Sequence, residues 1–132
     1  MKKTTILEPT FHIPIILLWD CDADQLDQFT EKRFGVSCDG EHTGDGYFTR
    51  FSNREAGDVG VIALTFPVWE ASPYQQAILS HEILHACFRF LKERGVKYAK
   101  ASEEAFCYVL SSLMEQAAEK MASVEERFNR KK

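Results

Sequence analysis

The sequence has no C-x-x-C pair, no long basic block and no apolar stretch long enough to cross a bilayer. Its net charge of -4 disfavours nucleic acid and anionic membranes as main partners. The lack of paired cysteine spacings favours four free thiols in a reducing compartment, namely Cys21, Cys38, Cys87 and Cys107. We therefore expect a cytoplasmic protein without a nucleic-acid or membrane partner.

The N-terminal region also lacks the features of a signal peptide. A basic start precedes an apolar run, but Glu8, His12 and Pro14 interrupt it and no small-residue cleavage site follows. The apolar and β-branched residues Phe11–Trp19 instead predict a strand buried on both faces. Pro14 is expected at the beginning of this strand or at an edge position.

The length of the chain limits its architecture. With 132 residues, of which 45% are hydrophobic, the chain can build a single domain (1–132) around one core. Two further strands are expected at Tyr47–Ser52 and Val59–Phe66, joined as a hairpin by residues 53–58. Residues 1–10 are expected to be a polar lead-in. The sequence thus predicts an α+β fold with a small three-stranded mixed sheet packed on helices.

Three helices are expected from apolar residues at helical spacing and from end signals. The first is expected to begin at Asp22 or Asp24 and to end at Gly35. The second is expected to begin at Ser72-Pro73 and to end at about Arg94, followed by Gly95. The third is expected to begin at Ser102 and to end at about residue 126. From Ala77 to Leu91 the second helix carries apolar residues on nearly every side, which predicts a helix buried on several sides. The charged end, from about residue 125 to 132, is expected to fray.

The second helix carries the pattern H-E-x-x-H, from His81 to His85. Residues four apart lie on one face of a helix, so both imidazoles can bind one metal ion. Glu82 lies one position further round, where its carboxylate can hold a metal-bound water. Two incidental histidines are the alternative explanation, but three polar groups in a buried helix need partners, and zinc would satisfy them together. We predict His81 and His85 as zinc ligands and Glu82 as the catalytic base.

A catalytic zinc ion usually has three protein ligands and an open position for water. The candidates for the third ligand are Glu103 and Glu104, at the start of the third helix. The short linker can span roughly 23 Å, enough to bring this helix start level with the histidines. The apolar stripe of the helix favours Glu103, which lies nearer the face carrying Phe106 and Leu110. Cys38 and His42, in a polar loop over residues 36–46, are more simply explained as solvated residues than as ligands.

The motif and the segment Glu104–Tyr108, which follows after residues 86–103, together resemble the gluzincin metallopeptidases. They are most similar to small zincin-like proteins of phages and mobile elements, over roughly residues 72–114. This resemblance implies a minimal zincin-like domain with zinc as cofactor and a peptide or protein as substrate. It also implies Glu104 as the third ligand, and Tyr108 either as a donor to the oxyanion or as a packing residue.

The activity that the resemblance implies is zinc-dependent hydrolysis of peptide bonds. Zinc would activate a water molecule, and Glu82 would take its proton and pass it to the leaving amine. A peptide would lie along a sheet edge beside the metal helix, here Tyr47–Ser52 or Val59–Phe66.

Two alternatives stay open at this point. The chain can be a non-catalytic module that keeps zinc for stability and binds a partner protein, which its small size favours. A hydrolase of the peptide deformylase type would need an upstream cysteine ligand, either Cys21 or Cys38, although neither lies in the expected Glu-Gly-Cys-Leu context.

Overall fold

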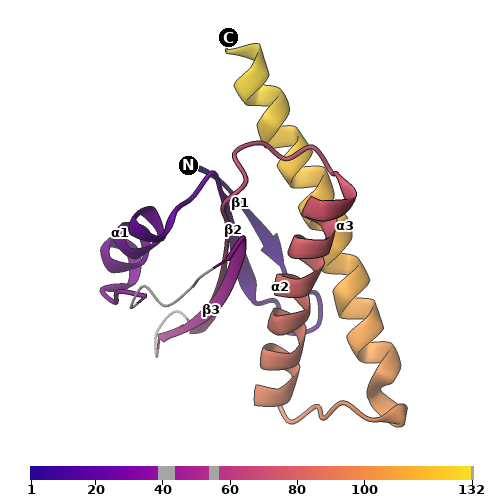
Figure 1. Ribbon diagram of the computed structural model, residues 1–132. Helices are drawn as coiled ribbons and strands as arrows, with labels where there is room; N and C mark the ends of the chain where they lie inside the picture. The colour runs from indigo at the N-terminus through magenta and orange to yellow at the C-terminus, as the bar shows by residue number, and fades with distance from the viewer. Residues whose placement is uncertain (39–43, 54–56, 132) are drawn as a thin grey trace.

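The computed structural model describes residues 1–38, 44–53 and 57–131, so His42 and the tip of the 53–58 connection lie outside the described residues. The described strands form one mixed sheet in the order β1-β2-β4-β3, and the predicted α+β class is confirmed (Figure 1). The strands are β1 (Lys2–Leu7), β2 (Pro14–Trp19), β3 (Gly46–Asn53) and β4 (Gly57–Leu64). The helices are α1 (Ala23–Phe34), α2 (Pro73–Glu93) and α3 (Glu103–Arg130), with a short 3-10 helix η1 (Lys100–Ser102) before α3.

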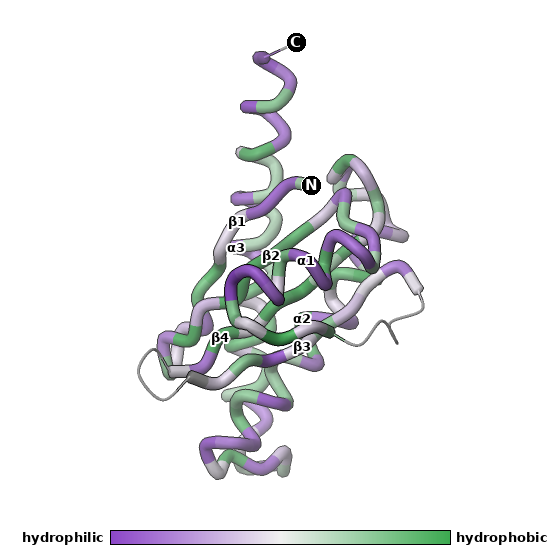
Figure 2. The backbone as a smooth tube through the Cα atoms, turned by 90° about the vertical axis from the view of Figure 1, so that its left-hand side faces the viewer, coloured by the Kyte–Doolittle hydropathy of each residue, from purple (hydrophilic) through white to green (hydrophobic). Residues whose placement is uncertain are grey.

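The two central strands carry the core. β2 runs parallel to β4, whereas β1 and β3 are antiparallel to their neighbours. Because successive side chains of a strand point to opposite faces, Ile15, Leu17 and Trp19 pack with α2 and α3, while Ile16 and Leu18 pack with α1. Figure 1 shows α1 on one face of the sheet and the other two long helices on the opposite face. Figure 2 shows that the central strands are largely hydrophobic.

The prediction of a three-stranded sheet is wrong, because residues 2–7 form the edge strand β1 rather than a lead-in. This strand is held by α3, which is distant in sequence. The Gln116 side chain accepts a hydrogen bond from Leu7 N–H at 2.8 Å and donates one to the Leu7 carbonyl at 2.8 Å. Lys120 Nζ donates to the Thr5 carbonyl at 2.6 Å. Side chains of α3 therefore form hydrogen bonds with backbone groups of β1. β3 forms the opposite edge of the sheet.

The predicted starts and ends of the first two helices are confirmed. The Asp22 carboxylate accepts a hydrogen bond from Gln25 N–H, and the Gln25 side chain accepts one from Asp22 N–H, which is a capping box. Ser72 Oγ accepts a backbone N–H in the first turn of α2. Gly35 and Gly95 follow the two helices with φ of 72° and 81°, a conformation that favours glycine.

α2 is buried along one side only, which corrects the prediction of a helix buried on several sides. Its buried side packs against the sheet and α3. His81 and His85 lie on the exposed side, together with Leu84 and Phe88, which are 39% and 41% exposed. These two apolar residues made the helix look buried in the sequence. The physical reason is that the sheet and α3 together cover only one side of the helix.

α3 continues past its expected end near residue 126, to Arg130. Glu125, which the sequence assigned to a frayed tail, is buried. Its carboxylate accepts hydrogen bonds from Lys2 Nζ, from Trp19 Nε1 at 3.4 Å and from the backbone N–H of Trp69. The end of α3 is thus tied to β1 and β2 and to the segment before α2. No helix in the described ranges is both long and apolar enough to cross a membrane.

Candidate metal centre

The two histidines of the motif point toward each other on the open side of α2. His81 Nε2 and His85 Nε2 are 3.2 Å apart, and the rings are nearly perpendicular, at 81°. The four-residue spacing places both rings on one face of the helix, one turn apart. In the absence of a metal, this distance is also that of a hydrogen bond between two neutral imidazoles of suitable tautomers.

The convergence of these nitrogens fits a zinc ion. Two imidazole nitrogens bound to tetrahedral zinc, with zinc–nitrogen distances near 2.0–2.1 Å, are about 3.3 Å apart. The separation of 3.2 Å between His81 Nε2 and His85 Nε2 matches this value. Both rings are exposed, so a metal ion and a water molecule can reach them from solvent. The spacing of the two histidines is therefore compatible with two of the three ligands of a catalytic zinc.

Glu82 lies beside the histidines but points under the edge strand. Its side chain is only 7% exposed. Burial raises the pKa of the Glu82 carboxyl above its ordinary value, while the nearby His85 and His81 lower it and offset part of this effect. A carboxyl whose pKa is raised accepts a proton more readily than an exposed one, which is the property that a general base uses.

Gly46, at the start of β3, provides the space that Glu82 occupies. A Cβ atom at this position would lie 3.0 Å from Glu82 Cγ, 3.0 Å from Ile78 Cγ2 and 3.3 Å from Glu82 Oε1. These distances are shorter than ordinary contacts, so any larger residue would displace the carboxyl or the strand. The edge strand can therefore lie directly over Glu82 of α2. No local pattern in the sequence around Gly46 indicates this role.

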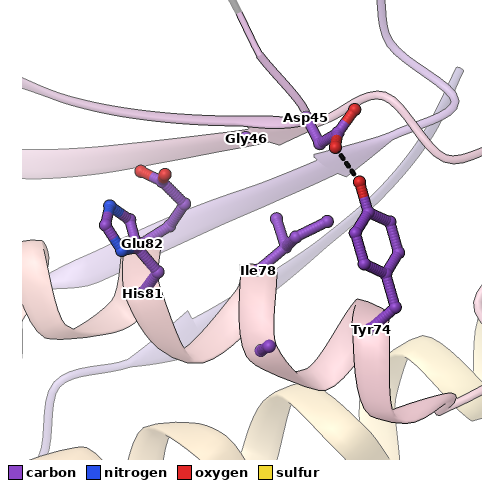
Figure 3. Close-up of a pocket in the computed structure, with 7 residues that line it drawn as sticks. Asp45, Gly46, Tyr74, Ile78, His81 and Glu82 are labelled. Carbon is purple, nitrogen blue, oxygen red and sulfur yellow. Dashed lines mark hydrogen bonds between the residues drawn. The ribbon is translucent and has the colours of Figure 1, made fainter.

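A pocket of about 330 Å³ lies between the start of β3 and the N-terminal half of α2. Its walls are Asp45, Gly46, Tyr74, Ala77, Ile78, His81 and Glu82. Figure 3 shows Asp45 and Tyr74 joined by a hydrogen bond at one end, His81 and Glu82 at the other, and Ile78 between them. Of the two sheet edges considered in the sequence, the structure leaves only Tyr47–Ser52, within β3, as an edge, because β4 lies between β2 and β3.

The predicted third ligands lie at the start of α3, away from the position expected for them. Figure 1 shows α2 and α3 running in opposite directions, with their linker at the C-terminal end of α2. Phe106 packs against Phe88, one turn beyond His85, with ring centroids 5.2 Å apart. Because the helices are antiparallel, Glu104 and Glu103 lie about 3 and 4.5 Å further along the axis from His85 than Phe106 does. The start of α3 is therefore not level with the histidines.

The structure does not gather the predicted third ligands, Tyr108 or the cysteines around the histidines. Glu103 and Glu104 are exposed, and Tyr108 is 60% exposed and thus not a packing residue. Among the residues that the structure describes, no group of three or more histidine, cysteine, aspartate or glutamate side chains is arranged to hold a metal ion. Cys21 and Cys38 pack in the cluster on the α1 face of the sheet, opposite α2. That position disfavours a cysteine ligand of the deformylase type.

Comparisons with known proteins give no relative. No protein-family model, no curated protein sequence and no solved structure matches this chain. The geometry of the histidine pair, of Glu82 and of the adjoining pocket therefore carries the functional argument by itself.

Proposed function

We propose that this protein is a zinc-dependent metallopeptidase with a minimal zincin-like fold. His81 and His85 would bind zinc, Glu82 would act as the general base, and Glu104 or Glu103 would complete the ligand set. The observation that carries the proposal is the convergence of the two imidazole nitrogens at 3.2 Å. A largely buried carboxyl lies directly beside them under an edge strand.

The chemistry follows from the donor set. Bound zinc supplies a Lewis acid that lowers the pKa of a water molecule towards neutrality and polarises a carbonyl group. Glu82 takes the proton of the attacking water on its carboxylate and delivers it to the nitrogen of the leaving amine. β3 is the last strand of the described sheet on the side of α2, and an extended peptide would add there as a further strand.

The experiment that tests catalysis is cleavage of an unstructured protein by the purified chain. Wild type with one equivalent of zinc should cleave it, and Glu82→Gln should lose at least about a hundredfold in rate, because general-base catalysis contributes that much. Glu82→Gln keeps the size of the side chain and both histidines, so its zinc content should be unchanged. Equal cleavage by the two proteins would reject the peptidase proposal.

A non-catalytic zinc-binding module is the second candidate, since Leu84 and Phe88 expose apolar surface next to His85. In that case zinc would stabilise the fold, and the partner protein would bind over the exposed side of α2. His81→Ala would then lower the melting temperature, whereas Glu82→Gln would leave partner binding unchanged. Loss of the biological effect in Glu82→Gln would reject this candidate.

A further inference from the structure

The pocket beside Glu82 has a charge pattern that the metal site does not require. Of the seven residues that line it, Asp45 and Glu82 carry carboxyl groups and none is lysine or arginine. The middle of the pocket is apolar, formed by Ala77 and Ile78, and the ring of Tyr74 forms a wall beside Asp45 (Figure 3). An apolar channel with an acidic far end suits a side chain with a long apolar stem and a cationic head.

Distance along α2 decides which side chains can reach the acidic end. Tyr74 and His81 are seven residues apart, which corresponds to about 10 Å along the helix axis. A residue held beside His81 and Glu82 must therefore extend past Ile78 before its end group meets Asp45. Short polar side chains would stop over the apolar middle of the pocket. Lysine and arginine are long enough, and the ring of Tyr74 adds a favourable surface for their charge.

Asp45 is held in place for such a contact. Its backbone carbonyl accepts a hydrogen bond from Thr65 N–H at 3.0 Å, which fixes the start of β3 to the end of β4. Asp45 Oδ2 accepts a hydrogen bond from the Tyr74 hydroxyl, and Asp45 Oδ1 accepts one from Thr65 Oγ1 at 3.5 Å. Each carboxylate oxygen has two lone pairs, so these bonds leave acceptor positions for a guanidinium or ammonium group.

We propose that this pocket, lined by Asp45, Tyr74 and Ile78, selects peptides with lysine or arginine next to the bond that is cleaved. As a statement about substrate the inference rests on the proposed peptidase function. As a statement about binding it can be tested without catalysis. Asp45 is the specificity-determining residue, and Tyr74 orients its carboxylate.

The test is an NMR titration of the isotope-labelled, purified full-length chain with two small probes. N-acetyl-arginine amide carries the cation, and N-acetyl-citrulline amide has the same shape without the charge. The arginine probe should bind about tenfold more tightly, the gain expected for a charge-assisted hydrogen bond, and should shift the resonances of Gly46 and Ile78. Asp45→Asn keeps an acceptor for Tyr74 and should abolish the difference between the probes. Asp24→Asn, which removes an exposed charge on α1, should preserve it.

Equal binding of the two probes by wild type, or a preference that persists in Asp45→Asn, would overturn the inference. Tyr74→Phe separates charge from shape, because it keeps the ring and the Asp45 carboxylate. Tyr74→Phe should keep part of the preference, because the charge of Asp45 remains although the hydroxyl no longer orients its carboxylate. Complete loss of the preference in Tyr74→Phe would overturn the inference and show that Asp45 and Tyr74 serve only to fasten β3 to α2. Failure of wild type to cleave any peptide would count against the peptidase proposal alone, since the titration decides the pocket independently.

Discussion

At the scale of single residues, the absence of a side chain at Gly46 is what allows Glu82 to lie under the edge strand. Gly46→Ala would place a Cβ atom 3.0 Å from Glu82 Cγ. The carboxyl must then move by several tenths of an ångström or more. Such a misplacement should lower kcat/KM for peptide cleavage by about ten- to a hundredfold.

The same variant should retain its zinc, because the added methyl group contacts Glu82 and Ile78 and neither histidine. Steady-state kinetics together with the metal content of Gly46→Ala check both halves of this prediction. Wild-type kcat/KM in the variant would show that the close approach of Gly46 and Glu82 has no part in positioning the base.

The sequence predicts residues of the site to the extent that their geometry is local. His81, Glu82 and His85 could be predicted because one helix sets their relative positions. Gly46 and Asp45 could not, because the packing of β3 over α2 brings them to the site from a distant part of the chain. The exposure of His81 and His85 was also missed, since it depends on which side of α2 the sheet and α3 cover.

At the scale of secondary-structure elements, the proposed zinc site would be completed from the start of α3. Glu104→Gln should weaken zinc binding at least about tenfold, and Glu103→Gln should have a smaller effect, if Glu104 is the third ligand. Because Phe106 packs beyond His85, the first turn of α3 would have to shift toward the histidines for a glutamate there to bind the same zinc ion.

Zinc competition with a chromophoric chelator compares the two variants, and hydrogen exchange follows the shift. Exchange of the amides in η1 and in the first turn of α3 should slow on adding zinc to wild type. Equal zinc affinity in wild type, Glu103→Gln and Glu104→Gln would contradict an acidic third ligand from this segment.

An ion-pair network fastens the C-terminal end of α2 to the hairpin of β3 and β4. Arg94 pairs with Asp58 at 2.8 Å, and Arg50 pairs with Asp58 at 3.8 Å and with Glu93 at 2.9 Å. The hydrogen bond from Arg94 lowers the pKa of Asp58 below its ordinary value of 3.8. The ionised carboxylate therefore stabilises the folded state above about pH 4, and this contribution is lost as pH falls through the lowered pKa.

Asp58→Asn should consequently cost about 1 kcal/mol of stability near neutral pH and almost nothing near pH 2. Urea denaturation of both proteins across this pH range measures the difference. Glu119→Gln, at an exposed position in the middle of α3, serves as the control, with little effect at any pH. A destabilisation by Asp58→Asn that grows as pH falls would contradict the account of the network.

Elements were predictable from the sequence where their signals are local, and β1 shows why others were not. β2 carries a continuous apolar run, whereas β1 begins with two lysines and two threonines and has a single fully buried side chain, Ile6. β1 is ordered by pairing with the neighbouring β2 and by hydrogen bonds from Gln116 and Lys120 of α3. These two residues of α3 are more than a hundred positions away in the chain. No local pattern signals such partners.

At the scale of the whole molecule, the two edges of the sheet have different surroundings. α3 covers β1, and the edge strand β3 lies over the candidate site. Glu125 fixes this arrangement, because its buried carboxylate binds Lys2, Trp19 and the Trp69 backbone.

Glu125→Ala should lower the free energy of unfolding by about 3 kcal/mol, since it removes the carboxylate partner of the largely buried Lys2 side chain and leaves the Trp69 N–H without its acceptor. Glu126→Ala, at a neighbouring position whose side chain is 69% exposed, should cost about 0.5 kcal/mol or less. Denaturant titration compares the two variants. Similar stability losses in both would show that Glu125 does not fasten α3 to the sheet.

The central claim is that His81 and His85 hold a zinc ion. Metal analysis of the purified chain after dialysis against zinc tests it most directly. The account predicts one zinc per chain in wild type and in Glu82→Gln, and none in a double variant with His81→Ala and His85→Ala. A wild-type chain without zinc, or a double variant that still binds one equivalent, would contradict it.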